Sequence, residues 1–265
     1  MDFMKNYIYL FFLSISLVTL NSCDSGGSSS SNNSGGGSAQ KRSLYVAGDS
    51  WADIMDDSLV QAELGERNLS SRVTVHKHGV GGSTARGWAS DSGGRLTNLA
   101  NAIAADPDPA PVVFLIVGGN DIFDNNSTDG EIAGYVGQIV SRLKTARSDV
   151  RIVFGGYDTF NLNVNPLQCN LLAITVLGST SPAVINNRVY NVYNASASVV
   201  NGYSNAQAVN TFGALTGRAG NPDLNTFSPV EYFDDCIHLN DAGYQIYLDT
   251  VFDLALQSVL DEDVE

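Results

Sequence analysis

The sequence predicts an α/β protein: a three-layer αβα sandwich around a five-stranded parallel sheet of the flavodoxin-like type. Two observations support this prediction. Short apolar runs alternate along the chain with stretches of helical composition, and Gly-rich polar segments follow each of the first four runs. Strands that alternate with helices form parallel sheets covered by helices on both faces. The predicted strands are 44–47, 73–75, 112–117, 152–154 and 208–212.

The segments between these strands predict the helices. Their composition favours helices over 52–64, 95–105, 131–147 and 183–203, with a last helix over 241–260. Residues 121–130 and 157–182 are predicted as long loops. One globular domain is therefore expected to span residues 43–265.

Composition limits the classes of function. The chain has 265 residues with a formal net charge of -14 and a pI near 4.4, so it repels phosphate backbones and nucleic-acid binding is excluded. His76 and His78 lie two positions apart on one face of a predicted strand, but no third ligand accompanies them. We therefore predict no metal site and no cofactor.

The N-terminus has the pattern of an export signal. Residues 7–20 are mainly apolar, shorter than the roughly 20 residues that cross a bilayer, and Lys5 precedes them. Leu20-Asn21-Ser22-Cys23 resembles the bacterial lipobox, in which the Cys carries the lipid. We predict a signal peptide over 1–22 and lipidation of Cys23. An ordinary signal peptide with a chance Cys is the alternative.

Residues 23–42 are predicted as a tether. Most of them are Ser, Gly or Asn, a composition that buries no core and forms a flexible chain reaching roughly 24 Å on average. This arrangement predicts a lipoprotein of the bacterial cell envelope, anchored to a membrane. By analogy with lipoprotein sorting, Asp24 favours the periplasmic side of the inner membrane.

Polar residues gather where the apolar runs end. The first run ends in Gly48-Asp49-Ser50, and Asp235 and His238 precede the last helix. Ligands of such sheets bind beyond the carboxyl ends of the strands. The other segments of this kind are 79–83, 118–121 and 155–158.

Four of these segments, in this order, resemble the conserved blocks of the SGNH (GDSL-type) hydrolases. The blocks are Gly48-Asp49-Ser50, the glycine turn with Gly82, Gly118-x-Asn120-Asp121, and Asp235-x-x-His238. The resemblance covers Ser43 to the C-terminus. It implies an oxyanion hole made by the Ser50 and Gly82 amides and the Asn120 side chain.

The residue types in the first and last of these blocks also suit nucleophilic catalysis. A Ser50 hydroxyl needs a base, which His238 can supply, and Asp235 can fix the tautomer of the ring. Asp234 is an alternative partner for the ring. Gly79 and Gly81 are alternatives to Gly82 as the glycine of the oxyanion hole.

Other residues of the blocks have less direct expected roles. Asp49 and Asp121 are interpreted as loop-fixing residues. Trp51, where the family often has Leu, is expected to affect substrate fit. A GxSxG elbow is excluded because position 52 is Ala.

The sequence therefore predicts a serine esterase that cleaves carboxylic esters or thioesters through an acyl-Ser50 intermediate. Its substrate would be a small-molecule, lipid or glycan ester. The alternative is a catalytically silent envelope lipoprotein that binds a glycan or acyl group in the same cleft.

Two cysteines remain after Cys23, and export to an oxidising compartment favours their pairing. A Cys169–Cys236 disulfide would join the 157–182 loop to the segment that carries His238. Two separate buried thiols are the alternative.

Overall fold

Five strands form one parallel sheet in the order β2-β1-β3-β4-β5. This is the flavodoxin-like order, and it confirms the predicted fold class. The structure, a computed structural model, describes residues 41–123 and 127–262. The strands are β1 (Arg42–Gly48), β2 (Val73–Gly79), β3 (Val112–Ile116), β4 (Arg151–Gly155) and β5 (Ala206–Val209).

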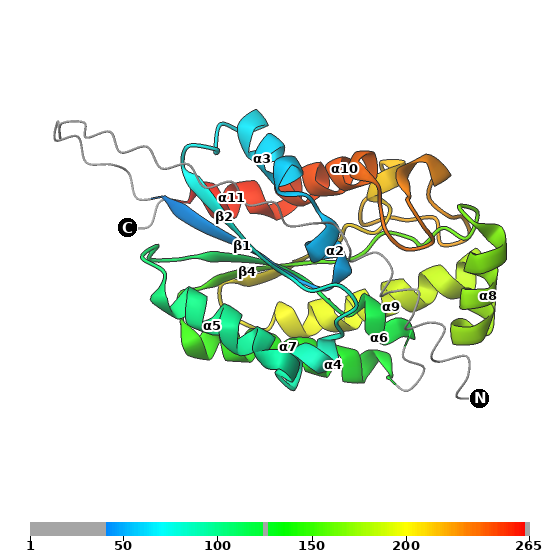
Figure 1. Cartoon of the computed structure of the whole chain (residues 1–265), viewed down its shortest axis with the longest axis horizontal. Coiled ribbons are helices and arrows are strands. Elements are labelled where there is room, and N and C mark those ends of the chain that lie inside the picture. The colour runs from blue at the N-terminus through cyan, green and yellow to red at the C-terminus, as the bar shows by residue number, and fades with distance from the viewer. Residues whose placement is uncertain (1–40, 124–126, 263–265) are drawn as a thin grey trace, which may run out of the picture. The chain divides into compact units, whose positions relative to one another are not determined.

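Helices cover both faces of the sheet (Figure 1). One layer contains α4 (Ala85–Ala89), α5 (Arg95–Ala105), α7 (Asp129–Ala146) and α9 (Pro182–Val200). The other contains α3 (Asp57–Glu66), α10 (Asp241–Val251), the π-helical turn η4 (Phe252–Leu256) and α11 (Gln257–Asp261). The predicted last helix is therefore a continuous run with a π-helical turn inside it.

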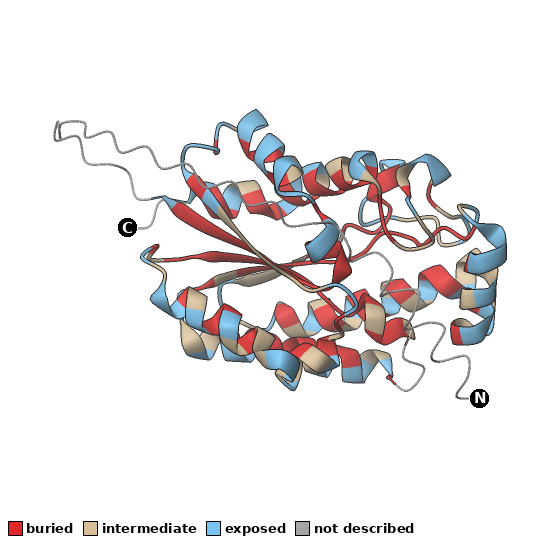
Figure 2. Ribbon diagram, in the orientation of Figure 1, coloured by how far each residue is buried: buried red, intermediate tan, exposed pale blue. Residues whose placement is uncertain are grey.

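The core lies on both sides of the central strands. Every residue of β1 and of β3 is buried (Figure 2). Strands covered on both faces carry continuous apolar runs rather than alternating ones, which is why these strands were predictable.

The predicted helix over 52–64 is wrong as a single element. It consists of α2 (Ser50–Ile54) and α3, separated at Met55, whose ψ of 110° is not helical. Asp56 then caps α3, because its carboxylate accepts the Ser58 N–H at 2.6 Å.

The predicted 157–182 loop contains a helix, α8 (Pro166–Leu177), with Pro166 at its first turn where a missing N–H costs nothing. The short helix α6 (Gly119–Phe123) was also not predicted, and β5 begins two residues before its predicted start.

No single helix among residues 41–123 and 127–262 has both the length and the apolar character to cross a membrane. The pair α8 and α9 passes that test only when taken together, and it is bent by 59°. The predicted signal peptide, Cys23 and nearly all of the tether lie outside the described residues.

Candidate active site

A tight turn at the end of β1 presents Ser50. Gly48 has φ +142°, and a Cβ there would lie 1.7 Å from the Ile116 carbonyl oxygen, so only glycine fits. Ser50 begins α2, and the Asp49 carboxylate accepts the Trp51 N–H at 3.1 Å. The hydroxyl therefore lies at the carboxyl end of β1.

A histidine and a carboxylate line up behind this hydroxyl. The His238 Nε2 atom lies 2.9 Å from Ser50 Oγ, and its Nδ1 atom lies 2.8 Å from Asp235 Oδ2. Asp234, the alternative partner, does not contact the ring; its N–H donates to the His238 carbonyl at 3.0 Å. The structure thus brings together Ser50, His238 and Asp235 as a hydrogen-bonded series.

The charge of Asp235 sets the tautomer of the ring. Burial opposes its ionisation, but hydrogen bonds from the His238 ring and from the N–H groups of His238 and Ile237 outweigh burial and hold the pKa of Asp235 below its usual range. An ionised carboxylate only accepts, so Nδ1 carries the proton and Nε2 is free to accept from Ser50.

The glycine turn after β2 separates three candidate glycines by their surroundings. A Cβ on Gly79 would lie 2.3 Å from the Asp53 nitrogen, so this glycine allows β2 to approach α2. The Gly81 N–H is occupied by the Asp53 carboxylate at 3.1 Å. Gly82 has φ +69° and open space around its Cβ position. Gly82 is therefore the glycine whose amide is left for a ligand.

Asn120 lies beside this turn, in α6. Its side-chain amide donates to the Ser83 carbonyl at 2.9 Å, and an amide NH₂ group carries a second hydrogen that can serve an oxyanion. Asp121 accepts the N–H groups of Ala85 at 2.6 Å and Arg86 at 3.1 Å, so it fixes the start of α4, a structural role.

The sequence profile of the GDSL-like lipase/acylhydrolase family matches residues 34–246. The chain belongs to this family. It is an SGNH-type ester hydrolase. No curated protein sequence matches the chain significantly.

Solved structures share the fold of this ester hydrolase at low sequence identity. One is a Streptococcus pneumonia protein named after platelet activating factor, with TM-score 0.58, 18% identity, and 95% of this chain and 96% of that chain covered. A carbohydrate esterase family 3 protein from Talaromyces cellulolyticus has TM-score 0.56 and 14% identity, with 84% of this chain and 100% of that chain covered. An acetyl-xylooligosaccharide esterase from Geobacillus stearothermophilus has TM-score 0.55 and 15% identity, with 85% of this chain and 97% of that chain covered.

A buried pair that the sequence did not predict joins two blocks of this ester hydrolase. The Tyr157 hydroxyl donates to the Asp49 carboxylate and accepts the Gly119 N–H at 2.8 Å. It thereby connects the Ser50 turn to the Asn120 segment. The only signal in the sequence was the position of Tyr157 at the end of the fourth strand, which did not indicate a partner.

Burial raises the pKa of Asp49 to about 7, although the Tyr157 hydroxyl and the Trp51 N–H partly offset it. A carboxyl that holds its proton more tightly when folded stabilises the fold at low pH, and this contribution is lost as pH rises through 7. From its ordinary value of 3.8, the shift corresponds to about 4 kcal/mol.

We therefore expect Asp49→Asn to remove part of the pH dependence of stability. The free energy of unfolding, measured in urea between pH 4 and pH 8, should fall with rising pH more steeply in the wild type than in Asp49→Asn. Other carboxyls contribute equally to both proteins, so the difference isolates Asp49. Parallel curves would contradict this prediction.

Trp51 is not a substrate-contacting residue, which corrects the expectation. It is 1% exposed and packs edge-on against Tyr157, Tyr244 and Tyr247. The second position of α2 points into the core, so the large side chain belongs to the packing beneath the nucleophile.

The two strand histidines lie on one face of β2, as their spacing predicted. His76 stacks on Tyr45 with ring centroids 4.7 Å apart, and His78 lies 5.7 Å from the same ring. Among the described residues, no group of three side chains suited to hold a metal ion occurs.

A second buried carboxylate supports the segment before the catalytic loop. Asp158 accepts the N–H groups of Gly213 at 3.2 Å and Leu215 at 2.9 Å, and the Ser228 hydroxyl at 3.1 Å. These bonds hold the 213–228 connection against the end of β4.

The structure contains the predicted disulfide between Cys169 and Cys236, with Cα atoms 5.5 Å apart. It joins α8 to the loop of His238. The Cys236 carbonyl also accepts the Asn161 N–H at 2.9 Å, so two links hold this loop from the same side.

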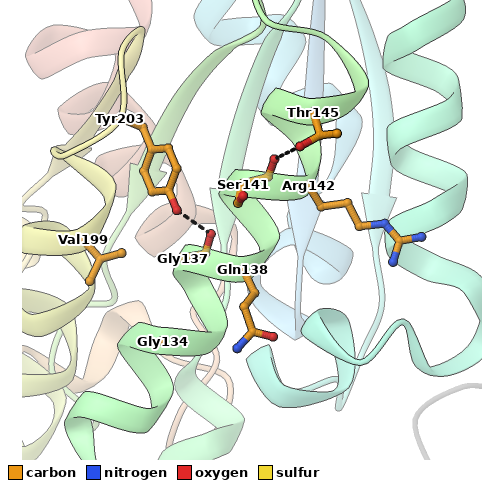
Figure 3. A pocket seen from close by; sticks show the side chains of 8 residues that line it. All are labelled: Gly134, Gly137, Gln138, Ser141, Arg142, Thr145, Val199 and Tyr203. Carbon is orange, nitrogen blue, oxygen red and sulfur yellow. Dashed lines mark hydrogen bonds between the residues drawn. The ribbon is translucent and has the colours of Figure 1, made fainter.

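A surface hollow of about 550 Å³ lies between α7 and α9, with Gly134, Gly137 and Tyr203 on its walls (Figure 3). The Tyr203 hydroxyl donates to the Gly137 carbonyl at 3.1 Å. None of the predicted site residues lines this hollow.

Proposed function

We propose that the protein is a serine esterase that forms an acyl-enzyme on Ser50. The observation that carries this proposal is the continuous series from Ser50 Oγ through the His238 ring to Asp235, with contacts of 2.9 and 2.8 Å. Substrates would be esters of small molecules, lipids or glycans: the family is one of lipases and acylhydrolases, and structures of similar fold include a carbohydrate esterase.

The reaction follows from the geometry. Ser50 Oγ attacks the ester carbonyl carbon while its proton moves to His238 Nε2. Asp235 stabilises the imidazolium that forms. The carbonyl oxygen becomes an oxyanion, which the amides of Ser50, Gly82 and Asn120 would stabilise by donating hydrogen bonds to it.

The intermediate then collapses. The bond between the carbonyl carbon and the alcohol oxygen breaks, and Nε2 returns its proton to the leaving alcohol. In the second half, water attacks the acyl carbon, its proton moves to Nε2, and the Ser50 oxygen leaves and recovers that proton. The carboxylic acid product departs from the unchanged enzyme.

An active-site label tests this proposal against a silent binding protein. A fluorophosphonate reacts with an activated serine hydroxyl, whose oxygen bonds to phosphorus while fluoride leaves, so we expect one phosphonate adduct per chain, on the tryptic peptide that contains Ser50. Mass spectrometry locates the adduct. Absence of labelling, or a label on another serine, would refute the assignment of Ser50.

We also propose that Cys23 carries a lipid and holds the enzyme on the periplasmic side of a bacterial membrane. The lipobox-like Leu20-Asn21-Ser22-Cys23 and the tether composition support this. In Cys23→Ser cells, we expect the protein to leave the membrane fraction or to remain unprocessed. Unchanged fractionation and unchanged size on a gel would contradict lipidation.

A further inference from the structure

The outer face of α8 carries an exposed apolar stripe. Leu167 is 83% exposed, Leu171 is 62% exposed and Ile174 is 55% exposed. Their spacing of four and three residues places them on one side of the helix. Figure 2 shows the exposed colour along the outer side of α8.

The opposite face of α8 is already occupied by the protein. Cys169, Ala173 and Val176 are buried, and the space beneath the helix, with Leu172 and Ile237 on its walls, measures only about 10 Å³. A helix that is apolar on both sides of its axis is typical of burial on both sides, yet here the outer side has no cover among the described residues.

This region also lacks charge. No Asp, Glu, Lys, Arg or His occurs between Asp158 and Arg188, although the chain as a whole carries 42 charged residues and a net charge of -14. Burial of a charge in an apolar medium costs far more than burial of apolar surface, and a segment without charged side chains avoids that cost. Without charged side chains, this segment cannot form ion pairs with a protein partner.

We propose that the outer face of α8 docks on a neutral lipid surface. A second copy of the chain is a less suitable partner for this face. The exposed fractions of the three side chains add up to about two fully exposed leucines, an area far below the roughly 800 Å² that each partner buries in a stable interface. An apolar helix face that lies in the interface needs no partner of defined shape.

The position of α8 gives this docking a consequence for the enzyme. α8 lies at the end of the domain toward which β1 points (Figure 1), and its disulfide to Cys236 attaches it to the loop of His238. A lipid surface beneath α8 would therefore lie beside the proposed site. Arg42, at the start of β1, lies toward the opposite end of the domain from α8. The 18 residues between Cys23 and Arg42 extend to about 60 Å, a length that would let α8 turn toward the bilayer while Cys23 stays anchored.

An introduced tryptophan tests the contact directly. The native Trp51 and Trp88 are each 1% exposed, so a new exposed tryptophan reports alone on the surface. With phosphatidylcholine vesicles, we expect Leu171→Trp to shift its emission to the blue and to be quenched by brominated acyl chains. The matched control is Leu254→Trp, since Leu254 is 55% exposed on η4, and its emission should not change.

Each alternative has its own result. Equal quenching of both tryptophans would mean that an N-terminal anchor only brings the domain close, and would overturn the proposal, as would no response of Leu171→Trp. A shift that grows with protein concentration without vesicles would identify a second copy and would also overturn it. Because the net charge is strongly negative, adding phosphatidylserine should not strengthen the response.

Activity gives a second readout, which rests on the proposed function. Leu171→Asp should hydrolyse a water-soluble ester such as p-nitrophenyl acetate at the wild-type rate. Its rate on an ester dispersed in phosphatidylcholine vesicles should fall by at least about tenfold, while Leu254→Asp keeps both rates. Loss of only the vesicle rate supports docking; equal vesicle rates in the wild type and Leu171→Asp refute it. Lack of all activity in the wild type would instead refute the esterase proposal, and the tryptophan experiment would still decide docking.

Discussion

Replacement of Ser50 or of His238 by alanine is expected to lower kcat for ester hydrolysis by roughly 10⁴-fold or more. Ser50→Ala removes the oxygen on which the proposed acyl-enzyme forms, and His238→Ala removes the ring nitrogen that lies 2.9 Å from that oxygen. Because the two groups act on one proton, the double variant should be no slower than either single variant. Initial rates with p-nitrophenyl acetate measure the effect.

Controls must separate chemistry from folding. Ser196→Ala removes another buried serine hydroxyl, 1% exposed on α9, and should retain the wild-type rate. Circular dichroism and Tm should show that Ser50→Ala remains folded. Wild-type turnover by folded Ser50→Ala would show that another group is the nucleophile.

The fold was predictable because the central strands carry their own signal. β1 and β3 are buried on both faces, so they read as apolar runs whatever packs against them. The break between α2 and α3 carried a weaker signal: Asp56 is a preferred N-cap residue, but a single Asp also occurs on exposed helix surfaces. α8 was missed because an apolar, charge-free segment with a disulfide cysteine is equally compatible with an ordered loop.

The candidate site was predictable to the extent that its residues follow strand ends. Ser50 and Asn120 follow β1 and β3, neighbouring parallel strands whose carboxyl ends meet at the same edge of the sheet. His238 follows no strand and reaches Ser50 from the segment before α10. The resemblance favoured Gly82 from the sequence, and the backbone angles and the position of Asp53, which only the fold supplies, distinguish its surroundings from those of Gly79 and Gly81.

Roles that depend on a distant partner could not be predicted. The Asp49–Tyr157 pair joins residues 108 positions apart, and nothing in the sequence around either residue indicates its partner. Trp51 was expected near substrate because it adjoins the nucleophile, but neighbouring helix positions point about 100° apart, which sends this side chain into the core.

Removal of the Cys169–Cys236 disulfide is expected to lower both activity and stability. The bond closes a segment of 67 residues, a constraint worth about 4 kcal/mol in the chain-entropy model. Cys169→Ala/Cys236→Ala should therefore unfold at lower urea concentration.

The loss of activity should come before the loss of the fold, because the bond holds the loop of His238 rather than the sheet. Below the unfolding transition, we expect the double variant to keep its circular dichroism while its kcat for p-nitrophenyl acetate falls by about tenfold or more, since misplacement of a base by about 1 Å can cost 10²-fold. The Asn161 N–H bond to the Cys236 carbonyl remains and should keep the loop from detaching completely. The single variant Cys169→Ala breaks the same bond but leaves Cys236 in the loop of His238. If the bond itself matters, its kcat should equal that of the double variant. A double variant with wild-type kcat would show that the loop is held without the disulfide.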